Sequence, residues 1–315
     1  MQYNPPDLHI VKQVIAQIFS HAPSILVDRM EEGMSTYVYR ISHANEVFYL
    51  RVQPEANASF APEVHVHQLL RSKGVKVPEV IHFERENELL QRSIMVTTEI
   101  KGMPLGHCAV ETDTRKILFE AGRDLAIINS LPVEGFGWIR RDKCEMTRLE
   151  AEFPTYRAFI SEHLESDLAD LEDRVLPKSD IITIGHILAR YDGWLDGGEA
   201  WLAHGDFDVT HIYQVQGQYT GIIDFGEIRG THMFYDLGHF KMYDGEMLPF
   251  LVFPYLVEGY REVTVLPPNY EQQVSLASLL IAVRTLARTL EKRPACIDDH
   301  HGLKSIQKDT QILLA

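Results

Sequence analysis

The stretch from residue 204 to residue 238 constrains the fold more than any other part of this chain. It holds three short acidic motifs, which are His204-Gly205-Asp206, Ile222-Ile223-Asp224-Phe225-Gly226 and Tyr235-Asp236-Leu237-Gly238. Between the first two motifs, two β-like runs flank a turn at Gly217, which predicts a β-hairpin. The second strand of this hairpin would return Asp224 to the side of Asp206, so that both carboxylates would share one site.

Two neighbouring carboxylates are what phosphoryl transfer requires. One must orient the attacking hydroxyl group, and the other must hold the divalent cation that neutralises charge on the transferred phosphate. We assign the first role to Asp206 and the second to Asp224. A His-Gly-Asp tripeptide alone is also an ordinary turn sequence, because glycine allows unusual backbone angles and aspartate binds nearby amides. The second acidic motif, which the hairpin would return to the side of Asp206, favours a functional site over an ordinary turn.

These motifs resemble those of the aminoglycoside phosphotransferase family, which has the protein-kinase-like fold. The family's catalytic loop reads His-Gly-Asp, four residues of any kind, and Asn, and its metal-binding segment reads Ile-Asp-Phe or Ile-Asp-Trp. Here His211 stands at the Asn position. That Asn normally gives an oxygen to a magnesium ion, and magnesium prefers oxygen ligands. The resemblance implies Asp224 as a metal ligand and leaves His211 as a hypothetical second one.

The first third of the chain supplies further parts that a kinase needs. Two alternating runs, over residues 32–40 and 46–52, predict a β-hairpin. Small residues near its start would let backbone amides approach phosphate oxygens, which makes Gly33, Ser35 and Thr36 candidate nucleotide-binding residues. The alternative is an ordinary surface hairpin turn with no ligand.

Arg51 lies next to the end of the second run, where kinase-like proteins commonly carry Lys. A guanidinium group stays charged and can contact two phosphate oxygens, so we expect Arg51 to position the phosphates. Family members pair this cation with a Glu that lies eleven residues before the Gly of a Gly-Val-x-Val-Pro segment. Glu63 has this spacing to the segment that begins at Gly74. The alternative is that Glu63 only stabilises the start of a helix predicted over residues 62–73.

A β-branched run over residues 93–100 predicts a strand, which the breaker at residues 101–104 ends. In the kinase-like fold such a strand leads into the linker between the lobes, whose backbone binds adenine. The resemblance therefore makes Glu99 and Ile100 candidate nucleotide-binding residues. A plain edge strand is the alternative, because main-chain contacts can be made by any residue type.

Apolar residues at helical spacing dominate the rest of the chain, over residues 111–129, 157–168, 182–195 and 272–290. Residues 134–138 are typical of a loop, and their Gly-Phe-Gly resembles a segment of the hygromycin-type phosphotransferases. We therefore expect an α+β, bilobal kinase-like fold. Residues 1–100 would form a small β-rich lobe that covers the nucleotide. Residues 101–315 would form a larger, mainly helical lobe with the catalytic residues and the substrate pocket.

Composition narrows the possible partners. The net charge of −15 over 315 residues argues against a nucleic-acid partner and would suit a cationic substrate. Three scattered cysteines, at positions 108, 144 and 296, argue against a disulfide framework and favour a cytoplasmic location. We see no secretion signal at the N-terminus, and the apolar run over residues 248–257 is too short to span a membrane.

Several other polar residues are expected to be structural. The resemblance implies that Asp236 braces the catalytic loop through hydrogen bonds, and His204 is expected to be buried within that loop. A second group of histidines lacks acidic neighbours at metal-ligand spacing, and we expect these at the surface. They are His65, His67, His300 and His301.

Together these features predict an ATP-dependent O-phosphotransferase, with GTP as a possible donor and Mg²⁺ as its ion. The acceptor would be a hydroxyl group of a small, cationic molecule, such as an aminoglycoside, a related antibiotic or an amino-alcohol or amino-sugar metabolite. The enzyme would act as a monomer or homodimer. The non-standard His211 and Arg51 support one alternative, a regulatory, nucleotide-binding pseudokinase. A hydrolase acting on a phosphate ester is a third hypothesis, but it would have no use for the N-terminal hairpin.

Overall fold

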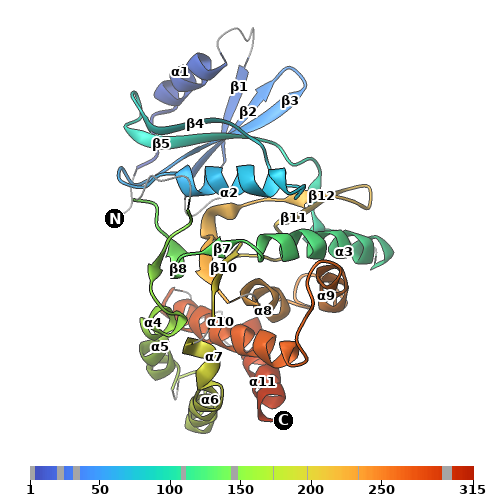
Figure 1. Ribbon diagram of the computed structural model, residues 1–315. Coiled ribbons are helices and arrows are strands. Elements are labelled where there is room, and N and C mark those ends of the chain that lie inside the picture. The colour runs from blue at the N-terminus through green and yellow to red at the C-terminus, as the bar shows by residue number, and fades with distance from the viewer. Residues whose placement is uncertain are drawn as a thin grey trace.

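The computed structural model describes residues 4–19, 25–30, 36–107, 111–142, 148–172, 174–196, 198–232, 234–292 and 300–315. Figure 1 shows a β-rich part near the N-terminus, which we call the N-terminal part, and a mainly helical C-terminal part. This arrangement agrees with the predicted α+β fold.

The N-terminal part is built on a five-stranded antiparallel sheet with the order β1-β2-β3-β5-β4. Its strands are β1 (Ile25–Met30), β2 (Tyr37–His43), β3 (Glu46–Val52), β4 (Val80–Asn87) and β5 (Arg92–Thr98). The predicted hairpin is formed by β2 and β3. Alternate residues such as Tyr39, Ile41 and Leu50 are buried, and they form one core with Val14 of helix α1 (Leu8–Ile18).

Helix α2 (Ala61–Ser72) lies between the two parts and contributes to both, as Figure 1 shows. The predicted helix differs from it by one residue at each end. Val66 and Leu70 belong to the main core of the C-terminal part, whereas Val64 lies in a small cluster with Met95 of strand β5. Because one helix serves two cores, the lobe boundary at residue 100 stays a prediction.

The C-terminal part contains two small sheets. The first has the order β12-β11-β6, with β6 (Met103–Pro104), β11 (Ile212–Val215) and β12 (Gln218–Ile222). The second has the order β7-β10-β13-β8-β9, with β7 (Pro132–Val133), β8 (Phe136–Ile139), β9 (Ala151–Phe153), β10 (Ala200–Ala203) and β13 (Arg229–Thr231). Strands β11 and β12 are the hairpin expected before Asp224, and Gly217 in their turn has a φ of 74°.

The prediction of a loop over residues 134–138 is wrong for residues 136–138, because residues 136–139 form strand β8. Gly135 and Gly137 have positive φ values of 88° and 87°, which accounts for the loop-like composition. Strand β8 pairs with β9 and β13. These partners lie elsewhere in the sequence, so local spacing did not reveal the pairing.

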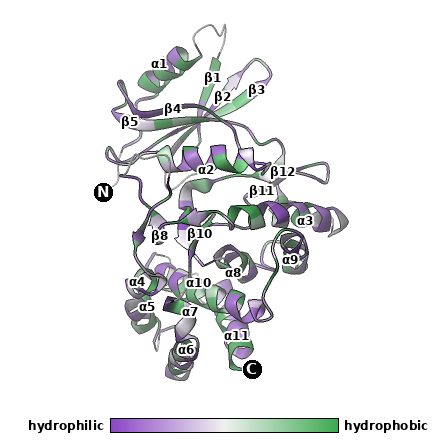
Figure 2. Ribbon diagram, in the orientation of Figure 1, coloured by the Kyte–Doolittle hydropathy of each residue, from purple (hydrophilic) through white to green (hydrophobic). Residues whose placement is uncertain are grey.

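Helices make up most of the remainder. They are α3 (Glu111–Ile128), α4 (Tyr156–Ser161), α5 (Leu164–Leu171), α6 (Lys178–Arg190), α7 (Asp192–Asp196), α8 (Tyr235–Met242), α9 (Phe253–Arg261), α10 (Tyr270–Lys292) and α11 (His301–Leu314). Figure 2 shows both apolar and polar residues along α2 and α3, as expected for helices with one buried face.

Two of the predicted helices are each divided in two. The run over residues 157–168 breaks between α4 and α5, and the run over residues 182–195 breaks after α6 at Tyr191. Apolar spacing continues across both breaks, so the sequence pattern alone did not show them. Thr155 begins α4 as its cap, with its hydroxyl oxygen accepting from the Ala158 N–H at 3.1 Å.

Helix α10 is long and apolar enough to cross a membrane by those two criteria alone. However, 67% of its most apolar 18-residue window is buried within the protein. Val274, Leu279 and Val283 of this helix belong to the main core. The helix therefore has the surroundings of a core helix.

Candidate functional site

The catalytic-loop candidate, residues 204–211, follows strand β10 and is supported by Asp236 of helix α8. The Asp236 carboxylate accepts from the N–H groups of His204 at 2.8 Å and Gly205 at 2.9 Å, and from Nδ2 of Asn129 at 2.7 Å. Asp236 is fully buried, so these bonds replace its contacts with water. The predicted bracing role of Asp236 is confirmed. Asn129, just after helix α3, gave no signal in the sequence.

The loop also requires its glycine and its buried histidine. Gly205 has a φ of 89°, and a Cβ atom there would lie 1.9 Å from the carbonyl oxygen of Glu227. His204 is buried, as predicted, and its Nε2 lies 2.9 Å from the carbonyl oxygen of Ile223. This bond joins the catalytic loop to the residue that precedes Asp224.

Asp206 presents its carboxylate at the open side of the loop. Its side chain is 44% exposed, and Oδ1 lies 3.4 Å from Nε2 of His239 on helix α8. No lysine or arginine forms an ion pair with Asp206 among the residues that the structure describes. A half-exposed carboxylate without a tight cationic partner is free to accept a hydrogen bond from a substrate hydroxyl group.

Asp224 lies two residues after strand β12, in the left-handed backbone region, with a φ of 64°. Its carboxylate accepts from the N–H of Gly226 at 3.2 Å and lies 3.9 Å from Nη2 of Arg51. Burial in the cleft would raise its pKa, but Arg51, then the histidines at 211 and 204, and the Gly226 N–H hold this pKa below its ordinary value. Asp224 is therefore an anion at neutral pH.

His211 lies between the two acidic residues. Its Nδ1 is 2.7 Å from the backbone oxygen of Asp206 and donates to it, which leaves the Nε2 lone pair facing Oδ2 of Asp224 at 4.0 Å. A metal-binding histidine is typically oriented by such a bond from its other nitrogen. Ligand atoms of Asp206, Asp208 and His211 also lie within 4.8 Å of one another. Asp224 is not part of that group, and its Oδ2 lies 4.0 Å from Nε2 of His211. Carboxylate and imidazole donors therefore meet at His211, and such donors can bind a divalent cation.

Arg51 and Glu63 form the ion pair that the resemblance implies. Nη1 of Arg51 donates to Oε2 of Glu63 at 2.5 Å, and the Glu63 side chain is completely buried. Nε of Arg51 also lies 3.4 Å from the hydroxyl oxygen of Thr36. The guanidinium group is thereby held between the start of the hairpin and Asp224.

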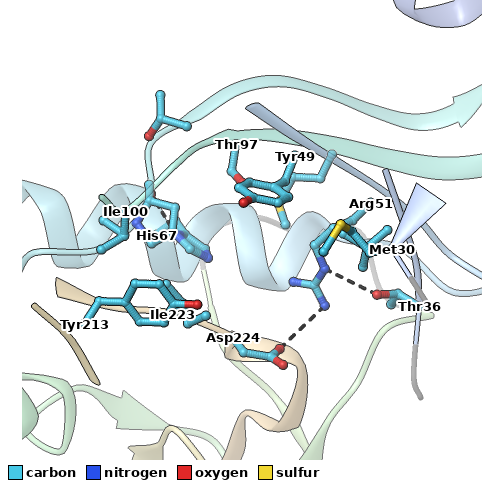
Figure 3. Close-up of a pocket in the computed structure, with 14 residues that line it drawn as sticks. Met30, Thr36, Tyr49, Arg51, His67, Thr97, Ile100, Tyr213, Ile223 and Asp224 are labelled. Carbon is cyan, nitrogen blue, oxygen red and sulfur yellow. Dashed lines mark hydrogen bonds and ion pairs between the residues drawn. The ribbon is translucent and has the colours of Figure 1, made fainter. Parts of the chain in front are cut away.

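Thr36, Arg51 and Asp224 line a cleft of about 300 Å³. Figure 3 draws the residues around this cleft. The predicted residues Thr36, Arg51, Ile100 and Asp224 line it, together with ten that the sequence did not single out for this site. These are Met30, Val38, Tyr49, His67, Pro78, Met95, Thr97, Thr98, Tyr213 and Ile223. The apolar members form a surface suited to a flat ring, and Arg51 and Asp224 form a charged end.

Of the predicted site residues that the structure describes, Glu63, Glu99, Asp206 and His211 are not in this lining. Gly33 and Ser35 lie outside the residues that the structure describes. The carboxylate of Glu99 accepts from the Tyr49 hydroxyl group at 3.5 Å instead of lining the cleft. Its expected role depended on main-chain atoms, so that role stays a prediction.

The prediction that His67 lies at the surface is wrong. It is 3% exposed, its Nδ1 is 2.9 Å from the carbonyl oxygen of Pro78, and its ring packs edge-on against Phe225. Burial lowers the pKa of His67 to about 4, so it is neutral at physiological pH. The sequence held one indication of this burial. His67 is four residues after Glu63, which places both side chains on one face of α2.

Comparisons with known proteins agree with this geometry. A model of the phosphotransferase enzyme family matches residues 27–265. Comparison with curated protein sequences gave no match.

Solved structures resemble the chain over nearly its whole length. An apo thermostable mutant of aminoglycoside phosphotransferase APH(4)-Ia has a TM-score of 0.65 and 17% identity, covering 96% of this chain and 98% of that one. The GDP complex of aminoglycoside 2'-phosphotransferase-IIIa has a TM-score of 0.64 and 18% identity, covering 98% and 99%. A putative fructosamine-3-kinase from Thermobifida fusca has a TM-score of 0.62 and 18% identity, covering 96% and 98%. At these identities the matches confirm the kinase-like fold.

Proposed function

The chain belongs to the phosphotransferase enzyme family, and we propose that it is an ATP-dependent small-molecule kinase that phosphorylates a hydroxyl group, with GTP as a possible donor. The observation that carries this proposal is the meeting of three groups in one place. These groups are the open carboxylate of Asp206, the anionic Asp224 beside His211, and the guanidinium of Arg51 held by buried Glu63.

The nucleotide is assigned to the cleft of Figure 3. Its base would lie on the apolar side near Ile100 and the backbone of Glu99, and its phosphates would lie toward Arg51 and Thr36. Amides near Gly33 and Ser35 are proposed to cover the phosphates. The neutral His67 adds no charge that would compete with Arg51 for the phosphates. In support, relatives of this fold have been crystallised with AMP-PNP or GDP.

Asp224 and His211 are proposed to hold Mg²⁺, which supplies positive charge to the phosphates when it is bound. Asp206 then orients the acceptor hydroxyl group and accepts its proton, while the hydroxyl oxygen attacks the γ-phosphorus and the bond to the β-phosphate oxygen breaks in line. Arg51 stabilises the negative charge that moves to the leaving nucleoside diphosphate. Each of these roles uses a side chain that already faces the cleft or the open side of the loop.

We propose a cationic acceptor such as an amino sugar, an aminoglycoside or an amino alcohol. Asp206 and Asp208 place two carboxylates on the catalytic loop, and the whole chain has a net charge of −15. Such a surface raises the local concentration of amine-bearing molecules. A related structure contains hygromycin B together with AMP-PNP. We expect the enzyme to act in the cytoplasm as a monomer or homodimer.

Mass spectrometry tests the proposal directly. The purified protein would be incubated with Mg²⁺, ATP or GTP and a panel of aminoglycosides, hygromycin B, macrolides and small amino alcohols. One product heavier by a phosphoryl group would establish the reaction and name the acceptor class. Nucleotide binding without transfer across a broad metabolite panel would instead favour the regulatory pseudokinase.

A further inference from the structure

The buried Glu63 has a second cationic partner that comes from the C-terminal part of the molecule. Arg51 uses Oε2 of Glu63, and Nη1 of Arg141 donates to the other oxygen, Oε1. Both carboxylate oxygens are therefore occupied by guanidinium groups. Arg141 lies two residues after strand β8, and its own carbonyl oxygen accepts from the N–H of Ser59 at 3.1 Å, just before helix α2.

Arg141 also contacts the loop that carries Asp224. Its Nη2 donates to the carbonyl oxygen of Gly226 at 2.8 Å, and the N–H of Gly226 donates to the Asp224 carboxylate at 3.2 Å. Gly226 is thus held from both sides of its backbone. Asp224 itself has a left-handed backbone, which is costly for a residue with a side chain and needs support from its surroundings.

We propose that Arg141 is a positioning residue that couples Glu63, and through it Arg51, to the metal-binding loop at Asp224. This inference rests on the proposed function. A planar guanidinium group can donate to two acceptors in fixed directions, and here those acceptors belong to helix α2 and to the loop after strand β12. The phosphate-binding cation and the metal-binding carboxylate therefore keep one relative position through a shared arginine.

The neighbouring Arg140 provides a matched control. Its side chain is 40% exposed and pairs with Asp142 at 2.9 Å, and it has no bond to Glu63 or Gly226. Replacing either arginine by Gln removes one positive charge from the same segment. Only the change at Arg141 removes the arginine that bridges Glu63 of helix α2 to the carbonyl oxygen of Gly226 in the metal-binding loop.

Calorimetry with Mg²⁺ and AMP-PNP tests the proposal. We expect Arg141→Gln to weaken Mg²⁺ binding to the nucleotide complex about 10- to 100-fold, as losses of groups that orient metal ligands do. Arg140→Gln should leave the affinity within about twofold, as surface changes usually do. In Arg141→Gln, the affinity for AMP-PNP without metal should fall less than the affinity for Mg²⁺. A general loss of structure would weaken both affinities alike.

A second variant keeps the test informative if Arg141→Gln folds poorly. Arg141→Lys retains a positive charge beside Glu63 but cannot donate to both acceptors in the same way. We expect it to fold with a wild-type melting temperature and to bind Mg²⁺ about tenfold more weakly. Wild-type Mg²⁺ affinity in Arg141→Lys or Arg141→Gln would overturn the inference and leave the proposed function standing. Failure of the wild-type protein to bind AMP-PNP would overturn both.

Discussion

Asp236 and Asp206 meet at the same catalytic loop in opposite surroundings. Asp236 is fully buried and accepts hydrogen bonds from two loop amides and from Asn129. The side chain of Asp206 is 44% exposed and has a histidine nitrogen 3.4 Å away. One carboxylate has its hydrogen-bonding capacity used by the protein, and the other keeps it for a ligand.

The same contrast separates Glu63 from Asp224. Glu63 is completely buried between two arginines, whereas the side chain of Asp224 is half exposed and faces His211 across 4.0 Å. We call Asp236 and Glu63 the support, and Asp206 and Asp224 the open face. The comparison teaches that residue type does not distinguish a supporting carboxylate from a reacting one, because burial and partners decide it.

The largest effect should come from the open face. Asp206→Asn removes the group that accepts the hydroxyl proton, so we expect kcat to fall about 10²- to 10⁴-fold. Nucleotide affinity should stay close to that of the wild type, because Asp206 does not line the nucleotide cleft. Steady-state kinetics and calorimetry would measure the two. Asp208→Asn is the matched control, with a much smaller loss expected, and unchanged turnover in Asp206→Asn would refute the assignment.

A change in the support should act on stability first. Asp236→Asn keeps the shape of the side chain but loses the charge that strengthens its hydrogen bonds. We expect the free energy of unfolding to fall by about 1.5–3 kcal/mol, the range for hydrogen bonds to charged groups. Urea denaturation would measure this loss. Wild-type stability would show that the buried carboxylate does not support the loop.

His67 predicts a pH dependence of stability. Its pKa is about 4 in the folded protein and near 6.5 in the unfolded chain, so the unfolded chain binds the proton more readily. Stability should therefore fall as pH decreases from about 6.5 toward 4. His67→Gln should reduce the loss of stability between pH 7 and pH 5 by about 2 kcal/mol, measured by urea denaturation at each pH. Parallel pH curves for the two proteins would contradict this role for His67.

The smallest expected effect concerns the choice of metal. Imidazole favours nickel over magnesium as compared with an amide oxygen, so His211→Asn should lower the preference for Ni²⁺ over Mg²⁺ by about fivefold. Calorimetry of the AMP-PNP complex with each ion would give this ratio. The same ratio of Ni²⁺ to Mg²⁺ affinity in His211→Asn and in the wild type would show that His211 is not a metal ligand.

Spacing within the sequence was sufficient to predict the hairpins, helix α2 and the pairing of Arg51 with Glu63. These features depend on residues that are close in the chain or on a family motif with a fixed spacing. The predicted lining of the nucleotide cleft was incomplete, because a residue such as Tyr213 reaches the cleft only through the pairing of distant strands.

The partners of the supporting carboxylates were harder to predict than the four carboxylates themselves. Asn129 and Arg141 reach the site from positions 107 and 85 residues away from their partners Asp236 and Gly226. Arg140 and Arg141 are adjacent and identical in type, so only the three-dimensional structure separates the surface residue from the one that contacts Glu63. Contacts of this kind join residues that are far apart in the chain, and local sequence patterns do not predict them.

Hydrogen exchange of the catalytic loop tests the central distinction between support and open face. The peptide covering residues 200–212 would be followed by mass spectrometry in the ligand-free wild type, Asp206→Asn and Asp236→Asn. We predict slow exchange of the His204 and Gly205 amides in the wild type and in Asp206→Asn, and faster exchange in Asp236→Asn, because only the last replaces one of the two accepting carboxylate oxygens by an NH2 group. Equally fast exchange in all three proteins would contradict the account, since the loop would then not be held in place before a ligand binds.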